Sequence, residues 1–94
     1  MRGKHHNVFF PAGFPALRKA MIENQGLFPR KRFEIQRAIG DGPLVAVHSR
    51  LRMSPDKPVM TVVHLFRFRG AKIVELWDLS QTVPDDSPNA DGAF

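Results

Sequence analysis

The sequence has 94 residues, of which 43% are hydrophobic and 24% are charged, a composition typical of one small folded domain. Cysteine is absent, which excludes disulfides and thiolate metal sites. No apolar run approaches the ~20 residues that cross a bilayer. We therefore expect a single cytoplasmic domain over residues 1–94 with no membrane contact. A chain of this size buries only about 60–65% of its unfolded surface, so dimerisation is the expected additional stabiliser.

The chain is basic, with a formal net charge of +5. Such a charge is typical of proteins that neutralise phosphates in nucleic acids. The only basic run is residues 30–32, however, and the other cations alternate with apolar residues along predicted strands. The sequence has no helix-turn-helix or zinc-finger spacing and no tyrosine. We therefore favour a solvated basic surface over a nucleic-acid partner.

One helix is predicted near the amino terminus, after residues 1–13, which show no helical period. Phe14, Leu17 and Met21 recur at helical spacing. Pro15 suits the first turn, and Gly26 is expected just past the end. Pro29 then disfavours helix at the residue before it.

From residue 32 onward the apolar residues alternate, which predicts strands. The expected strands are residues 32–39, 43–53, 59–68 and 72–83, and residues 84–94 are expected to be a loop-like tail. Asp41-Gly42 and Gly70-Ala71 are typical two-residue hairpin turns. The fold class predicted is α+β, with a curved four-stranded antiparallel meander and helical cover.

Turn lengths predict which residues face each other across the sheet. A three-residue middle loop would place the two strand histidines opposite each other, whereas a slip of one residue would separate them onto different faces. The predicted facing pairs are His48 with Ile35, His48 with His64, His64 with Trp77, Phe66 with Glu75 and Phe68 with Ile73. Both faces of this sheet are apolar, and one helix cannot cover both. We therefore expect a partner subunit, as a homodimer through the outer face, or residues that this chain lacks.

The sequence resembles the SnoaL-like polyketide cyclase branch of the nuclear transport factor 2-like superfamily. The resemblance rests on an ordered series of segments covering nearly the whole chain: "HHN", "GFPALRKAM", "RFEIQRAIGDGPLVAVHS", "VVHLFRFRGAKIVELWD" and "LSQTVPDDSPNADGAF". It implies a cone-shaped α+β fold, usually closed by one or two further amino-terminal helices, so this chain looks truncated or minimal. Many relatives carry aspartate at the position of His64 and histidine at that of Leu76. The family's cyclases are thought to use a pocket aspartate, which His64 would replace.

His64 is the strongest candidate for a general base, because a histidine titrates near neutral pH and this one lies in an apolar strand. The alternative is a core histidine held by one hydrogen bond. The candidate catalytic residues are His64, His48 and Glu75, and the candidate substrate-binding residues are His6, Phe33, Phe66 and Trp77. The alternative for His48 is a place at the cavity rim, for Trp77 plain core packing, and for Glu75 an ion pair with Arg67. His5 is expected to be solvated, and Asp78 is expected to be structural, on the face opposite to His64.

These residues predict a pocket for a small apolar ligand. The resemblance implies a cyclase or isomerase that abstracts a proton next to a carbonyl group and needs no cofactor. The histidines show no HxH or HxxxH spacing, so no metal site is expected. The alternatives are a non-catalytic ligand-binding or dimerisation module and, third, a basic nucleic-acid binder.

Overall fold

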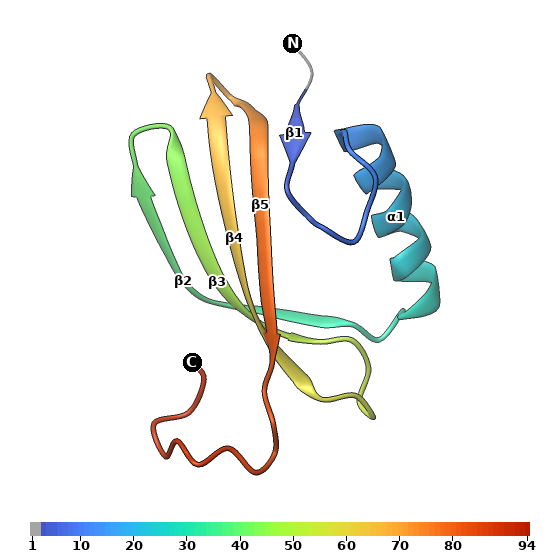
Figure 1. Ribbon diagram of the computed structural model, residues 1–94, viewed down its shortest axis with the longest axis vertical. Coiled ribbons are helices and arrows are strands. Elements are labelled where there is room, and N and C mark those ends of the chain that lie inside the picture. The colour runs from blue at the N-terminus through green and yellow to red at the C-terminus, as the bar shows by residue number, and fades with distance from the viewer. Residues whose placement is uncertain (1–2) are drawn as a thin grey trace.

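A five-stranded sheet and one helix make up the regular structure of the computed structural model, which describes residues 3–94 (Figure 1). The elements are β1 (Lys4–His5), α1 (Phe14–Leu27), β2 (Arg32–Asp41), β3 (Leu44–Arg52), β4 (Val59–Arg69) and β5 (Lys72–Thr82). The sheet order is β1-β5-β4-β3-β2, with β1 parallel to β5 and all other pairs antiparallel. The predicted α+β class with a curved sheet is confirmed. The count of four strands is wrong, because β1 is too short to give a periodic signal.

Helix α1 begins where its sequence predicts and ends slightly later. Gly13, at φ +93°, precedes the first turn, in which Pro15 lies. Gly26 is part of the last turn rather than beyond it, so the predicted stop is wrong. The helix ends before Phe28, whose N–H donates to the Asn24 carbonyl oxygen, since a residue before proline avoids the helical region.

The two tight hairpins differ in how well the sequence predicts them. The Gly70-Ala71 turn is confirmed, with Gly70 at φ +60°. The first hairpin turns one residue later than predicted, at Gly42-Pro43, and Asp41 pairs with Leu44. Gly42 has φ +56°, and a proline without an N–H fits the second turn position better than a place in the strand ladder.

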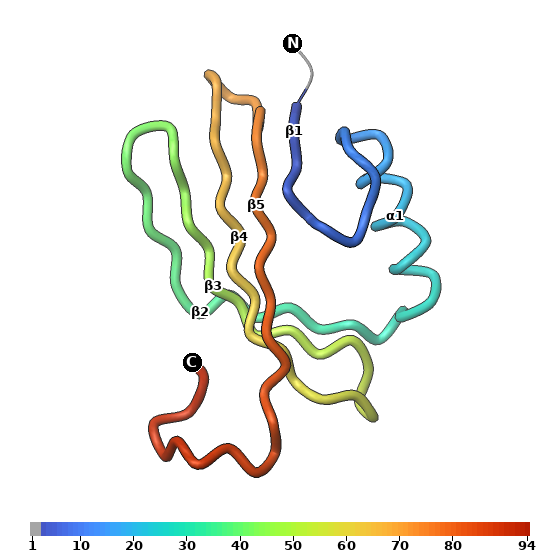
Figure 2. Tube along the Cα trace, in the orientation of Figure 1, coloured from blue at the N-terminus to red at the C-terminus, as the bar shows by residue number. Residues whose placement is uncertain are grey.

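Bulges change the facing pairs along the sheet. The β2–β3 register shifts between Ile35 and Arg37, and the β4–β5 register shifts beside Val74, which has no partner. Each extra residue moves the following side chains to the other face. Figure 2 shows that β2 also bends sharply midway along its length.

The register of the two strand histidines follows from the loops and bulges. His64 faces Asp78 instead of Trp77, and His48 faces Val63 instead of His64. Four of the predicted pairs are therefore wrong, including Phe66 with Glu75 and His48 with Ile35, whereas Phe68 does face Ile73. The middle loop has six residues, 53–58, and pairs Arg52 with Val59. The two histidines consequently lie on different faces of the sheet.

The two faces have different surroundings. We call the face that shares a groove with α1 the inner face; its members include Phe33, Val47, Ser49, Leu51, Val62, His64, Phe66, Leu76 and Asp78. The outer face includes Ile39, His48, Arg50, Leu65, Arg67, Glu75 and Trp77. The buried residues of the described chain are Leu17 of α1, His5, Ser49, Leu51 and Val62, and those on strands all belong to the inner face. The core therefore lies on the inner side.

The molecule is more open than a closed domain of its mass. Its radius of gyration is 14.6 Å, against about 12.4 Å expected for 94 compact residues. Its accessible surface is 7161 Å², roughly 1,700 Å² above the value expected for a monomer of this mass. All ten residues of the edge strand β2 are exposed, and α1 stands beside the β1 edge rather than across the sheet (Figure 2). Within residues 3–94, no helix is long and apolar enough to cross a membrane.

Candidate functional site

A histidine, a carboxylate and an amide meet on the inner face. His64 Nε2 lies 3.5 Å from Asp78 Oδ1, because β4 and β5 place these residues directly opposite each other. Asn7, just after β1, donates its Nδ2–H to Asp78 Oδ2 at 2.9 Å. The interaction with His64 is the main cause of a lowered pKa at Asp78; partial burial opposes it. The carboxylate is therefore held ionised beside the imidazole.

Aromatic rings flank this imidazole. The centroid of the Phe33 ring lies 6.1 Å from that of His64, and the centroid of the Phe66 ring lies at 5.9 Å. About one fifth of the His64 side chain remains exposed. The imidazole is thus accessible, and its immediate neighbours on two sides are apolar.

A groove of about 660 Å³ runs between α1 and the inner face. The α1 residues that line it include Phe14, Leu17, Met21 and Ile22, and the sheet contributes Phe66, Ile73 and Leu76. Phe66 belongs both to this groove and to the rings around His64. The lining is therefore mainly apolar, with Arg18 and Gln25 as its polar members, and Phe66 connects the groove to His64.

His5 supports the amino-terminal loop of this site. Its Nε2 lies 2.6 Å from the Pro11 carbonyl oxygen, and its Nδ1 accepts the Asn7 N–H at 3.2 Å. A carbonyl oxygen only accepts hydrogen bonds, so His5 is the neutral tautomer with its proton on Nε2. The expectation of a solvated His5 is wrong, since this residue is only 9% exposed. Its bonds fix the loop from which Asn7 reaches Asp78.

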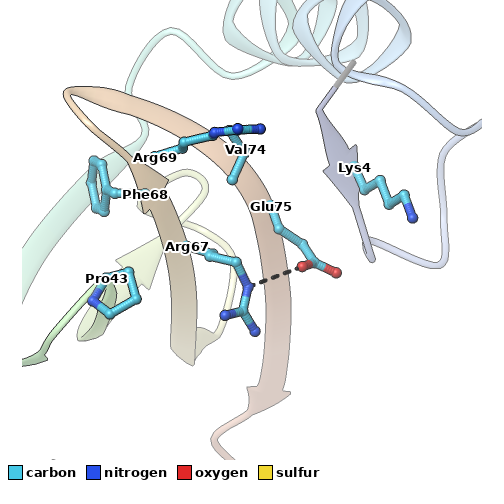
Figure 3. A pocket seen from close by; sticks show the side chains of 7 residues that line it. All are labelled: Lys4, Pro43, Arg67, Phe68, Arg69, Val74 and Glu75. Carbon is cyan, nitrogen blue, oxygen red and sulfur yellow. Dashed lines mark hydrogen bonds and ion pairs between the residues drawn. The ribbon is translucent and has the colours of Figure 1, made fainter. Parts of the chain in front are cut away.

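A second cluster lies on the outer face. His6 Nε2 is 2.7 Å from Glu75 Oε2, and Arg67 Nε donates to Glu75 Oε1 at 3.2 Å (Figure 3). The hydrogen bond from His6 is the main cause of a lowered pKa at Glu75, and the bond from Arg67 adds to it. Trp77 stacks with His6 at 5.0 Å, and the Arg67 guanidinium lies 5.6 Å from the Trp77 ring centroid. Glu75 is therefore part of a polar network on the outer surface.

His48 also belongs to the outer face. Arg37 donates to its Nδ1, since a guanidinium has no acceptor, and its Nε2 lies 2.6 Å from Thr61 Oγ1. Phe94, the last residue, stacks on the imidazole at 5.7 Å. Both nitrogens of His48 are thus occupied by neighbours, and it has no path to His64.

The predicted site residues divide between the two faces. His64, Phe33 and Phe66 come together on the inner face, whereas the outer face holds His48, Glu75, His6 and Trp77. The predictions that His48 and Trp77 face His64 are wrong, because both lie on the other side of the sheet. Sequence reasoning missed Asp78 and Asn7 as neighbours of His64. Asp78 was assigned to the wrong face because the bulge at Val74 reverses the parity of β5.

No three of the described histidine, aspartate and glutamate side chains converge as a metal site requires. The inner cluster consists of one histidine, one carboxylate and one amide. Its chemistry is that of an acid–base pair, with the imidazole and the carboxylate at ion-pair distance.

Comparisons with known proteins agree with this fold. The sequence matches the SnoaL-like domain family over residues 4–76, about three quarters of the chain. The chain therefore belongs to the SnoaL-like domain family of the nuclear transport factor 2-like superfamily. A search of curated proteins gave no match.

Proposed function

We propose that this protein binds a small apolar carbonyl compound in the inner groove and abstracts a proton next to the carbonyl, with His64 as general base. The observation that carries the proposal is the His64–Asp78 pair, placed between two phenylalanine rings at the end of an apolar groove. Family membership supports small-molecule binding. The chemistry of the pair supports the catalytic step.

Asp78 sets the roles of the two imidazole nitrogens. With Nε2 facing Asp78, a neutral His64 carries its proton on Nε2 and offers Nδ1 to the substrate. Nδ1 then takes a proton from the carbon next to the carbonyl, leaving an enolate and an imidazolium. Asp78 stabilises the imidazolium by its negative charge, as carboxylates do in histidine-based catalysis.

The fate of the enolate decides the reaction class. Return of the proton from His64 to a different carbon gives an isomer. Attack of the enolate carbon on a second carbonyl of the same molecule closes a ring, and the imidazolium returns the proton to the new alkoxide. Neither route uses an oxidant or a cofactor, because base, apolar surroundings and positioning supply what enolate chemistry needs.

Deuterium exchange tests the proton-abstraction step without knowledge of the natural substrate. The probe is 1-tetralone in D₂O, in which enolisation replaces the protons next to the carbonyl by deuterium. We expect the wild-type protein to accelerate exchange, and His64→Asn to reduce the protein-dependent rate about 100-fold or more, the usual contribution of a general base. His48→Asn is the matched control and should retain the wild-type rate.

The second candidate function is ligand binding without catalysis, which the same groove favours. In that case 1-tetralone binds but wild type and His64→Asn exchange its protons at the rate of buffer alone. This result would overturn the role of His64 and leave binding in the groove intact.

A further inference from the structure

The outer face of the sheet carries eight of the 14 lysine and arginine residues of the chain. Arg50 and Arg52 lie there on β3, and Arg67 and Arg69 on β4, because residues two apart on a strand share a face. The cross-strand register adds Lys4, Arg32, Arg37 and Lys72 from the other strands. Because these cations alternate with other residues, they look dispersed in the sequence. The same alternation places them together on one face of the sheet.

Few carboxylates balance these cations. The outer face holds eight lysine and arginine residues against three carboxylates, those of Glu34, Asp41 and Glu75. The formal charge of these strand residues is therefore +5, a sum that leaves out Asp85, Asp86 and Asp91 of the tail that brings Phe94 to this face. On the inner face, Asp78 is the one lysine, arginine, aspartate or glutamate residue among the paired strand positions, so the positive charge of the sheet lies on its outer face.

Two pairs of like charges face each other directly on this surface. Arg32 lies opposite Arg52 at the outer end of β2, and Arg69 lies opposite Lys72 beside the last hairpin. Like charges in directly opposed positions destabilise a sheet. Arg52 also donates to the carbonyl oxygens of Pro55 and Lys57, and an anion bound across Arg32 and Arg52 would reduce the remaining repulsion. A second copy of the same face would instead add a further +5 charge.

Rings lie between the two like-charged pairs. Trp77 stacks with His6, and Phe94 stacks on His48 while the Arg50 guanidinium lies 6.0 Å from its ring. Phe94 is 38% exposed, so part of its ring is accessible to a base. Beside the rings, a hollow of about 550 Å³ is lined by three cations, Lys4, Arg67 and Arg69, and by one carboxylate, Glu75, which is bonded to Arg67 (Figure 3).

We propose that the outer face binds single-stranded nucleic acid, with phosphates on its cations and bases on its rings. Cationic surfaces with interspersed aromatic rings bind single strands in this way, with little sequence preference. A single strand fits better than a duplex, because its bases are unpaired and can stack on exposed rings. This surface is separate from the inner groove, so it does not rest on the function proposed above.

The binding experiment uses the intrinsic fluorescence of Trp77, the only tryptophan, with a 20-nucleotide poly(dT) strand. We expect quenching on binding and an affinity that falls steeply between 50 and 200 mM salt, as counterion release requires. Arg32→Glu/Lys72→Glu should weaken binding about tenfold or more and lower the salt slope by about 1.4. The control Lys19→Glu/Lys57→Glu has the same net charge but alters exposed residues outside the face, and should bind within about twofold of wild type.

Several results would overturn the proposal. The first is the absence of binding by wild type at 50 mM salt. The second is an equal loss of affinity in both double variants, which would mean that binding depends on the net charge and not on this face. Quenching by vesicles of phosphatidylserine but not by poly(dT) would assign the face to a membrane surface. A wild-type dimer that excludes poly(dT) would assign it to a second copy.

If the glutamate variant does not fold, Arg32→Gln/Lys72→Gln gives the same comparison. Either variant should retain the 1-tetralone exchange of wild type, which keeps this test independent of the inner groove.

Discussion

At the scale of single residues, His64 and Asp78 answer why a histidine lies in so apolar a strand. The imidazole has a carboxylate partner across the sheet, and that carboxylate is held in turn by Asn7. A buried or half-buried polar group of this kind is stable when its partners are in place. Apolar alternation in the strand predicted the environment of His64, but its partner depends on a bulge that leaves no clear signal in the sequence.

The lowered pKa of Asp78 makes stability depend on pH. Because the folded-state pKa lies below the ordinary value of 3.8, folding favours the ionised form. The stabilisation is complete above pH values near that ordinary pKa and is lost as pH falls through the lower folded-state pKa. We therefore expect Asp78→Asn to lose less stability than wild type on acidification from pH 6 to pH 3. Urea unfolding at a series of pH values measures this, and parallel curves for the two proteins would contradict it.

At the scale of elements, glycines at two positions have opposite conformations. Gly26 lies within α1, whereas Gly42 has φ +56°, and an added Cβ meets nothing within 4 Å at either position. Gly26→Ala should therefore stabilise the protein by about 0.5–1 kcal/mol, since alanine favours helix. Gly42→Ala should destabilise it by about 1–2 kcal/mol, the cost of a left-handed non-glycine residue. Opposite shifts in the urea midpoint are expected, and shifts of the same sign would contradict the two assignments.

The two faces of the strands also differ in what they contribute to folding. Leu51 is 8% exposed on the inner face, whereas Leu79 of β5 is 60% exposed. Leu51→Ala should cost about 2–5 kcal/mol through lost burial and a cavity. Leu79→Ala should change stability by about 0.5 kcal/mol or less, as exposed positions usually do. Thermal or urea unfolding compares them, and similar losses would mean that the outer face is covered in solution.

The sequence predicts elements better than it predicts how they combine. Alternation located the four long strands, and Phe14, Leu17 and Met21 located the helix. The register could not be predicted, because it depends on a six-residue middle loop and on single-residue bulges at Gln36 and Val74. Each of these changes the face of the sheet on which the following side chains lie. Of the seven predicted site residues, the three on one face therefore come together, and the other four form a different surface.

At the scale of the whole molecule, two surfaces of different chemistry lie back to back. The inner face is mainly apolar, with the His64–Asp78 cluster and the buried His5 and Ser49 as polar exceptions, and shares its groove with α1. The outer face carries the positive charge. The excess of roughly 1,700 Å² of exposed surface is enough for substantial binding on either side, since a standard protein interface buries about 800 Å² per partner.

Occupation of the inner groove should stabilise the open fold. A ligand that binds only the folded state raises stability by about 2.7 kcal/mol at a concentration 100 times its dissociation constant. For a domain of this size, that corresponds to a rise of roughly 10–20 °C in Tm. Thermal unfolding with saturating 1-tetralone measures the shift, and an unchanged Tm at saturation would contradict selective binding to the folded state.

The most direct test of the account is to map where 1-tetralone binds by NMR. The useful probes are the methyl groups of Met21, Ile73 and Leu76 in the groove, the ring of His64 beside it, and the Trp77 indole N–H on the outer face. We predict progressive shifts of the groove methyls and of the His64 ring, with the Trp77 signal unchanged. Shifts confined to the Trp77 signal would contradict an inner-face binding site. So would the absence of any shift at 1-tetralone concentrations that saturate apolar binding sites in other proteins.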